Sequence, residues 1–370
     1  MSKFTKKLCK TIALILTGAV ALLLGFLLSS ILSSGFLNGG DILFFVIGVS
    51  ILTYLSIIFH EAGHLVFGLI SGYKFSSFRI GSLMWIKQDG KIHLRRMSIA
   101  GTGGQCLMIP PEPKSGKIPV KLYNLGGVIF NFVFCAIFAI LYAVTLRYIV
   151  IALTFLISTI ISFILVVTNG IPLDMGGVAN DGMNAYHLSK DPTSAVAFRK
   201  QLLMNAAQAE GVRLSDMPGE WFEIPDGADV NNVHISSIAV FAASRVLDSG
   251  DLVLAEQSIT SLLNSSYNII GIHRSLLTCD LIYCRLINGN GEAEKLITPE
   301  LKKFMSAMKK FPSVLRTEYA IALLIDKDEA KANKIMADFE KQSKKFPYAQ
   351  EICAEKAFMA KVLDKYRTAT

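Results

Sequence analysis

The sequence lacks paired cysteines. Its six cysteines are scattered and none forms a Cys-x-x-Cys pair, which argues against a disulfide framework and against a zinc site built from cysteine. Charge is also scarce, because Asp, Glu, Lys and Arg make up 18% of the 370 residues, whereas 52% are hydrophobic and the mean hydropathy is +0.46. This composition is too apolar for an ordinary soluble protein and is typical of a membrane protein with a soluble part.

The C-terminal half lacks a net charge. Residues 185–370 hold 23 basic and 23 acidic residues, whereas residues 1–184 hold 14 basic and 6 acidic ones, so the whole excess of +8 falls in the N-terminal half. Nucleic-acid binding would need a basic soluble face studded with aromatic residues, and a neutral C-terminal half does not offer one. We therefore expect no nucleic-acid partner.

Four apolar stretches are long enough to span a bilayer, at residues 11–36, 42–70, 125–146 and 148–168. Four lysines precede the first stretch, and the loop 71–124 carries nine lysines and arginines, whereas the loop at 37–41 carries none. Because basic residues mark the cytoplasmic side, both termini and the loop 71–124 are predicted to be cytoplasmic. We expect a multi-pass protein embedded in the lipid bilayer of the cell membrane.

A metal-binding pattern lies within the second apolar stretch. His60-Glu61-Ala62-Gly63-His64 has the form H-E-x-x-H, which places two imidazoles at i and i+4 on one face of a helix, where they can share one zinc ion. Glu61 between them can take a proton from a water at the metal. The alternative is a structural histidine pair in a core, but His, Glu and His together beside hydrocarbon need a partner.

A catalytic zinc usually takes three protein ligands, so one is still to be found. No further histidine pair exists at ligand spacing. A segment directly after the fourth apolar stretch offers two carboxylates, Asp174 and Asp181, and Gly182 permits a close backbone turn beside the second. Either carboxylate can complete the site.

The combination of H-E-x-x-H on an apolar helix with a later Asn-x-x-Pro and Asp-Gly resembles the site-2 protease family of intramembrane zinc metalloproteases. Asn169 and Pro172 match that family, but the spacing departs from it. Leu173-Asp174 is followed by Met175 before Gly176-Gly177, so the Asp-Gly pair arrives later, at Asp181-Gly182. The resemblance covers residues 42–190. It implies that His60, His64 and Asp181 bind Zn²⁺, and it favours Asp181 over Asp174.

The third apolar stretch also resembles the family, through Gly126, Gly127 and Asn131. Small residues let helices approach closely. Asn131 is predicted as a catalytic residue that binds the substrate backbone or stabilises the developing oxyanion. The equally weighted alternative is an amide that only joins two helices.

The loop 71–124 contains two runs, 74–80 and 91–97, that alternate partly between apolar and polar residues, and the turn signal Gln88-Asp89-Gly90 lies between them. A small β-hairpin or sheet at the cytoplasmic membrane face is predicted. An exposed strand edge can hold an unwound substrate as an added strand. The alternative is an amphiphilic hairpin that lies on lipid headgroups.

The C-terminal region reads as helical hairpins over 238–263, 275–308, 314–343 and 350–366, after a loop-like segment at 209–232. Lys309-Lys310-Phe311-Pro312 recurs as Lys344-Lys345-Phe346-Pro347, a spacing of 35 residues that is close to the period of tetratricopeptide-like repeats. A degenerate helical repeat is predicted. Such a domain can bind a protein partner along a concave face, or it can serve only as a stabilising helical cap.

These observations predict a mainly α polytopic membrane protein with about four transmembrane helices, a small cytoplasmic β element and a C-terminal helical domain. The predicted domains are 1–41, 42–190 and 191–370. The predicted function is a zinc metalloendopeptidase that cleaves membrane-spanning proteins or peptide precursors. The alternative is a membrane-anchored helical-repeat scaffold with a structural or vestigial metal site. A transporter is disfavoured, because four spans without an inverted repeat do not fit one.

Overall fold

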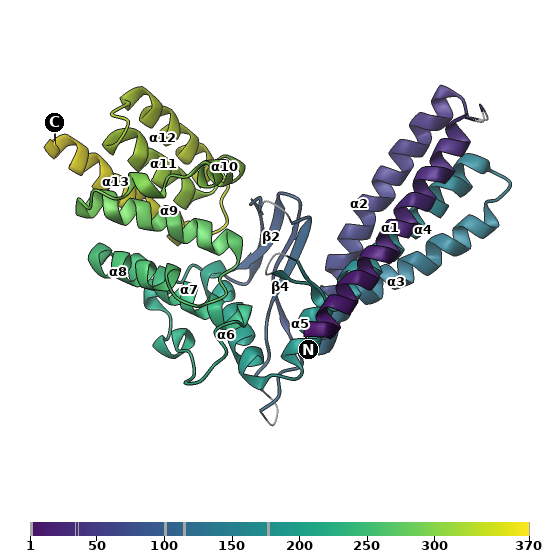
Figure 1. Ribbon diagram of the computed structural model, residues 1–370, viewed down its shortest axis with the longest axis horizontal. Helices are drawn as coiled ribbons and strands as arrows, with labels where there is room; N and C mark the ends of the chain where they lie inside the picture. Colours follow the sequence, from purple (N-terminus) through teal and green to yellow (C-terminus); the bar gives the residue numbers. More distant parts are fainter. Residues whose placement is uncertain are drawn as a thin grey trace. The chain divides into compact units, whose positions relative to one another are not determined.

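The computed structural model describes residues 3–33, 35, 37–99, 102–113, 116–175 and 178–369. Within these ranges the chain forms thirteen α-helices and one four-stranded antiparallel sheet (Figure 1), which confirms the predicted mainly helical class. The contacts divide the chain into two compact units. The first unit comprises Met1–Lys74 and Pro111–Pro192, and the second comprises Phe75–Pro110 and Thr193–Thr370.

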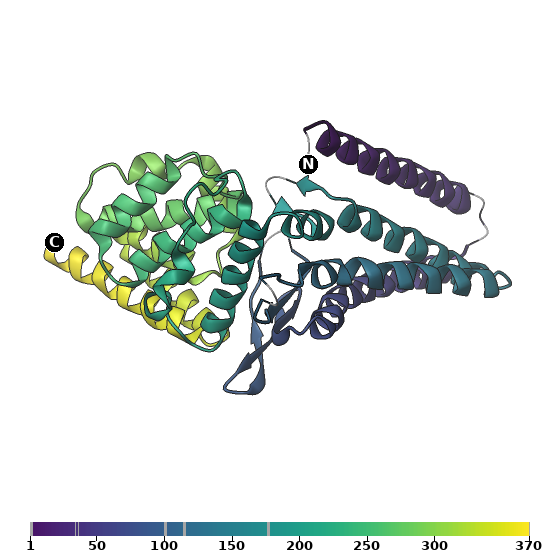
Figure 2. The ribbon, with the colours of Figure 1, turned by 90° about the horizontal axis from the view of Figure 1, so that it is seen from below.

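The first unit is built from four long helices, α1 (Lys3–Ser33), α2 (Gly39–Ile70), α3 (Val120–Val144) and α4 (Ile149–Gly170). Helices α2, α3 and α4 contact one another, and α1 lies against α4 (Figure 2). A short hairpin of β5 (Asp174–Met175) and β6 (Val178–Ala179) and the helix α5 (Asp181–Leu188) follow α4. Gly176 and Gly177, which lengthen the interval before Asp181, lie outside the described residues.

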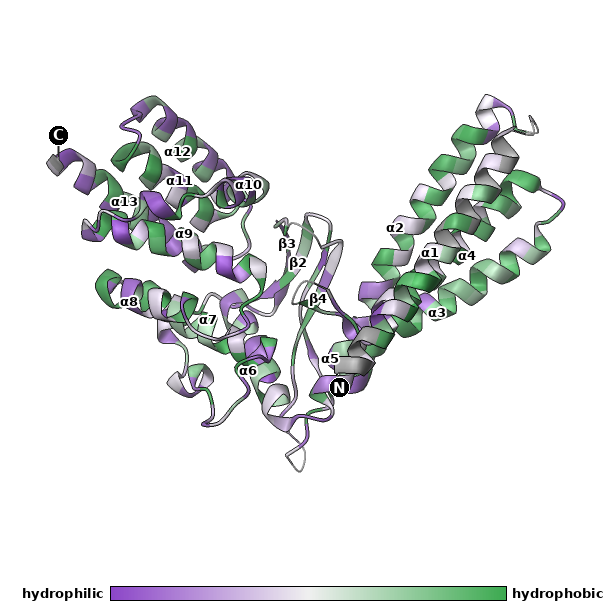
Figure 3. Cartoon of the chain, in the orientation of Figure 1, coloured by the Kyte–Doolittle hydropathy of each residue, from purple (hydrophilic) through white to green (hydrophobic). Residues whose placement is uncertain are grey.

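Helices α2, α3 and α4 are each long and apolar enough to cross a membrane, and Figure 3 shows them as mostly hydrophobic. Three of the four predicted spans are therefore found as candidate spans. The first predicted span falls on α1. The apolar stretch found there, Leu8–Ala19, is shorter than the three candidate spans, and residues 34 and 36 lie outside the described residues. A span at 11–36 stays a prediction.

Asn38 is the N-cap of α2 and forms a capping box with Asp41.

The two predicted runs are strands of one sheet in the order β3-β2-β1-β4, but they do not pair with each other, because a strand that the sequence did not identify, β2, lies between them. The strands of this sheet are β1 (Lys74–Ile80), β2 (Leu83–Gln88), β3 (Lys91–Arg96) and β4 (Gly104–Ile109). The turn between β2 and β3 lies at the predicted position, where Asp89 and Gly90 both adopt positive φ. Met84 and Ile86 are buried on one face of β2, whereas Trp85 between them is exposed on the other.

The C-terminal region is a stack of helices in which some sequence neighbours pack together and α11 packs on α9, α12 and α13. Its members are α6 (Pro192–Ala209), α7 (Val233–Asp248), α8 (Leu252–Leu263), α9 (Gly271–Asn288), α10 (Pro299–Ala307), α11 (Pro312–Leu324), α12 (Glu329–Ser343) and α13 (Ala349–Ala369). Only two short 3₁₀ turns occur in the predicted loop at 209–232, η1 (Leu214–Asp216) and η2 (Gly219–Phe222). Three of the predicted hairpin segments each hold two helices, α7 with α8, α9 with α10 and α11 with α12, whereas the fourth, 350–366, is the single helix α13. Gly289, in the left-handed region at φ 83°, ends α9.

One face of the sheet packs on this helical stack. Met84 and Ile86 share a buried cluster with Phe339 and Phe346. The backbone N–H of Arg96 donates to the carbonyl oxygen of Lys345 at 2.9 Å. The strands between residues 75 and 110 therefore belong, by their contacts, with the C-terminal helices. The domain limits drawn from the sequence stay predictions.

Candidate metal centre

Two imidazoles and one carboxylate meet in the first unit. His60 and His64 lie one turn apart on α2, and their Nε2 atoms are 3.3 Å from each other. Asp181, the first residue of α5, places Oδ2 at 3.1 Å from Nε2 of His60 and at 3.4 Å from Nε2 of His64. Among the described residues these three form the group of His, Cys, Asp or Glu side chains that can hold a metal ion.

The spacing of these three atoms fits a divalent ion. Bonds of about 2.0–2.1 Å at tetrahedral angles place any two zinc ligand atoms roughly 3.3 Å apart. The three measured separations, 3.1, 3.3 and 3.4 Å, all lie near that value. A set of two nitrogens and one oxygen also leaves one tetrahedral position for water or a carbonyl oxygen.

Three glycines allow α2 and α3 to pack closely beside this cluster. A side chain at Gly63 would overlap the carbonyl group of Gly126, and a side chain at Gly126 would overlap that of Gly63. A Cβ at Gly127 would lie only 2.6 Å from Cε1 of His60. The α2–α3 contact therefore depends on glycine at three positions, two of which the sequence singled out as close-approach residues.

The outer nitrogen of each imidazole has a partner on α3. Nδ1 of His64 lies 2.8 Å from the carbonyl oxygen of Tyr123, which can only accept, so Nδ1 carries the proton. Nε2 of a neutral His64 then presents its lone pair to the site. Tyr123 was not identified from the sequence, because a backbone carbonyl leaves no signature in the residue type.

Asn131 holds the other imidazole. Its side-chain amide lies 3.0 Å from Nδ1 of His60, and the residue is completely buried. The two ends of an amide exchange when it is turned over. With its oxygen toward His60, Asn131 accepts from Nδ1–H and leaves Nε2 of His60 free to bind a metal. The oxygen Oδ1, as placed, has no hydrogen-bond partner among the residues described.

Asn180 fixes the position of the carboxylate. Its side-chain oxygen accepts from the backbone N–H of Met183 at 2.9 Å and of Leu173 at 3.0 Å, and its amide donates to the carbonyl oxygens of Thr168 and Ile171, each at 2.6 Å. The residue thus caps α5 and ties it to the end of α4. Sequence reasoning did not identify Asn180, although an asparagine just before a helical segment is an N-cap signal.

Gly182 acts differently from its expected turn role. It lies inside α5, and a side chain there would overlap the carbonyl group of Gly170. Its contribution is therefore close packing of α5 on α4. Asp174, the alternative ligand, lies in β5, is exposed, and is not part of the metal-ligating group. The geometry brings Asp181, and not Asp174, to the histidine pair.

Glu61 follows His60 on α2 and is 8% exposed. It is therefore an ionisable group held beside the histidine pair in an apolar helix.

The pKa of the carboxylate in the cluster, that of Asp181, is shifted from its ordinary value. Burial raises the pKa of Asp181, but hydrogen bonds and attraction from His60 and His64 in their protonated form outweigh burial and lower the pKa to about 2. Asp181 is thus an anion at neutral pH, as a metal ligand must be.

The family model of peptidase family M50 matches residues 44–337, which is most of the chain and includes every residue of the cluster. No curated protein and no solved structure matches the sequence. The members of this family, which is that of the site-2 proteases, are metallopeptidases of membranes, and the resemblance seen in the sequence is thereby confirmed.

Proposed function

The chain belongs to peptidase family M50, and from that premise we propose that it is a zinc-dependent endopeptidase that hydrolyses peptide bonds in or near membrane-spanning segments. The observation that carries the proposal is the convergence of His60, His64 and Asp181 within 3.4 Å of one another beside a buried Glu61. The substrate class is a membrane-spanning protein or a peptide precursor.

His60, His64 and Asp181 would hold the ion. Two imidazoles and one carboxylate with an open position are the donor set of catalytic zinc in peptidases, and zinc is the metal we propose. When bound, the ion supplies a Lewis acid that polarises the scissile carbonyl and acidifies water. The protein's own part is to keep both Nε2 lone pairs and one carboxylate oxygen aimed at a common point.

Glu61 is the proposed general base and acid. It would accept a proton from the attacking water and return it to the leaving amine. Its burial beside apolar residues removes competing solvent and strengthens its interactions with the reacting groups. Glu61 also separates this proposal from the scaffold alternative, because a purely structural metal site needs no general base between its two histidines.

Asn131 has a different proposed role from the one predicted. Its complete burial and its contact with Nδ1 of His60 support a positioning role, in which it holds the tautomer and the ring orientation of His60. A direct contact with substrate remains the sequence-based alternative. The two roles differ in their readout, since a positioning residue changes metal affinity, whereas an oxyanion donor changes turnover alone.

Placement in the membrane supports a substrate that is itself apolar. Helices α2, α3 and α4 carry the site or its partners and are candidate spans. His60 and His64 lie in the last third of α2, next to the basic loop 71–124 that we propose to be cytoplasmic. Cleavage is accordingly proposed near the cytoplasmic face, with both termini on that side. A protein partner on the C-terminal helices stays a prediction.

The test is the substitution Glu61→Gln, which removes the base and keeps nearly the same volume. Membranes that carry the wild type or the variant are compared by labelling new peptide N-termini and identifying them by mass spectrometry. We expect cleavage of the affected membrane peptides to fall by about 10²–10⁴-fold, the range for loss of a general base. Metal content should be unchanged.

Glu300→Gln is the matched control, because Glu300 is an exposed acid on α10. Its products should equal those of the wild type. If Glu61→Gln cuts the same peptides at the wild-type rate, the enzymatic proposal is wrong.

A further inference from the structure

The repeated sequence Lys-Lys-Phe-Pro has no role in the site described above. The first copy ends on Pro312, the first residue of α11, and the second ends on Pro347, just before α13, so each copy lies at the start of a helix. The second lysine and the phenylalanine of each copy, Lys310-Phe311 and Lys345-Phe346, line one cavity of about 300 Å³. Two segments that are 35 residues apart in sequence therefore present the same side chains to one cavity.

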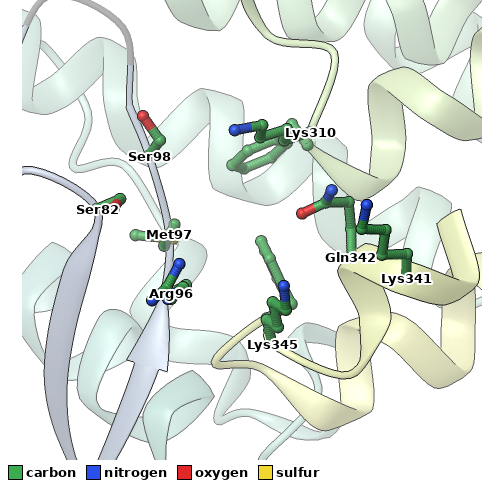
Figure 4. Close-up of a pocket in the computed structure, with 10 residues that line it drawn as sticks. Ser82, Arg96, Met97, Ser98, Lys310, Lys341, Gln342 and Lys345 are labelled. Carbon is green, nitrogen blue, oxygen red and sulfur yellow. The ribbon is translucent and has the colours of Figure 1, made fainter. Parts of the chain in front are cut away.

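The cavity is strongly basic. Its remaining lining comes from Lys341 and Gln342 at the end of α12 and from the strand side, with Ser82, Arg96, Met97 and Ser98. Figure 4 shows the basic side chains on both walls, Arg96 on the strand side and the lysines on the helix side. Four cations and no carboxylate line the space.

The four cations have no protein partner within the described part of the chain. Neither Arg96 nor any of the three lysines forms an ion pair there, whereas other lysines of the same unit do: Lys295 pairs with Glu292, Lys331 with Asp326 and Lys356 with Glu340. Like charges that face a common cavity repel one another. A bound anion would relieve this repulsion.

The floor of the cavity is apolar and fixed. Phe346 is 7% exposed and belongs to the buried cluster that joins the sheet to the helices. Phe311 packs edge-on against it, with ring centroids 5.7 Å apart. Phe311 is also the N-cap of α11 and gives that helix no side-chain cap, so the positive end of α11 faces the same region. The two phenylalanines therefore form a preformed apolar floor below the lysines.

We propose that this cavity binds a small phosphate-bearing anion of at least two negative charges. Lysines are point-charge donors to phosphate, and a volume of about 300 Å³ lies at the small end of ligand sites, which suits a phosphate or a headgroup rather than a folded partner. The anion comes either from solution or from the headgroup of an anionic lipid. The inference does not depend on the proteolytic function.

The repeat itself provides the matched variants. Lys310→Ala with Lys345→Ala removes the inner pair, which lines the cavity. Lys309→Ala with Lys344→Ala removes the outer pair, which has the same charge, is exposed and is outside the lining. All four lysines are exposed, so both double variants should fold. Their thermal unfolding is compared with that of the wild type to check this.

Two arms identify the source of the anion, both with the full chain in an uncharged detergent. Binding of inorganic pyrophosphate is measured by calorimetry, and retention of added phosphatidylglycerol is measured by native mass spectrometry. In one arm or both, we expect the wild type and the outer-pair variant to bind alike and the inner-pair variant to bind at least about tenfold more weakly.

Binding of pyrophosphate alone assigns the site to a soluble phosphate, and retention of the lipid alone assigns it to a headgroup. The proposal is overturned if the wild type binds neither probe. It is also overturned if both double variants weaken binding equally, because that result would reflect diffuse surface charge.

Discussion

Each unit of the chain buries a cluster of charged or ionisable side chains, and the two clusters are completed differently. In the helical stack, Arg316 is 1% exposed and pairs with Glu355 at 3.2 Å and with Asp280. Its guanidinium also lies 4.5 Å from the ring centre of Tyr283. In the membrane unit, Oδ2 of Asp181 lies within 3.4 Å of the Nε2 atoms of His60 and His64, and no Lys or Arg pairs with it among the described residues.

The difference lies in where the cation comes from. The chain itself supplies the cation of the first cluster, Arg316, so that cluster is a structural element that needs no metal ion. The second cluster contains one carboxylate and two imidazoles, and the outer nitrogen of each imidazole lies within hydrogen-bond distance of a group on α3. Buried metal-ligating side chains with no lysine or arginine among them are typical of a metal site. Three predictions test this distinction, from the largest expected effect to the smallest.

The first substitution is Arg316→Met, which leaves Asp280 and Glu355 buried without their cation. We expect the free energy of unfolding of the helical stack to fall by about 3–5 kcal/mol, because an uncompensated buried charge is costly. Chemical denaturation followed by helical circular dichroism measures the loss. Metal content should stay at the wild-type level.

Lys356→Met is the control, because Lys356 forms an exposed pair with Glu340. Its cost should stay below about 1 kcal/mol. Replacing Arg316, Asp280 and Glu355 together by apolar residues should cost less than replacing Arg316 alone. A single and a triple variant of equal stability would show that the two carboxylates do not depend on Arg316 as their cation.

Removal of the metal by a chelator is the second test. A ligand present at a hundredfold excess over its Kd stabilises the state that binds it by about 2.7 kcal/mol, so chelation should loosen the helices that hold the site. Hydrogen exchange detected by mass spectrometry should show faster exchange in α5 and unchanged exchange in α11. Equal changes in both helices would argue against a metal that is confined to the first unit.

Asn131→Ala is the third test and has the smallest expected effect. Loss of a residue that orients a ligand lowers metal affinity by about 10–100-fold. The matched control is Asn124→Ala, because Asn124 is a buried asparagine on the same helix whose amide donates to the carbonyl oxygen of Val120 and not to the site. Competition with a metal indicator dye gives both affinities. Unchanged affinity with reduced turnover would instead assign Asn131 to the substrate.

The parts of the fold and site that the sequence predicts are those with local signals. H-E-x-x-H depends on helical periodicity alone, and the histidines do converge as that spacing requires. The hairpin at Gln88-Asp89-Gly90 depends on turn chemistry and is present. Asp181 needed a family resemblance, because no local rule says which of two carboxylates after α4 returns to α2.

The remaining features depend on contacts between distant residues. Alternation in β2 predicts that one face is buried, but it does not say that Met84 and Ile86 pack on the C-terminal helices. Tyr123 contributes a backbone oxygen, so its residue type carries no signal. Asp280, Arg316 and Glu355 come from three different helices and have no common spacing, so their cluster appears only in three dimensions.

The central claim, that His60, His64 and Asp181 bind one zinc ion, is tested most directly by metal content. Inductively coupled plasma mass spectrometry measures it in the purified chain and in two matched variants, Asp181→Asn and Asp174→Asn. We expect about one zinc per chain in the wild type and in Asp174→Asn, and a loss of most of that zinc in Asp181→Asn. Zinc that is retained in Asp181→Asn, or lost in Asp174→Asn instead, would contradict the metal centre described here.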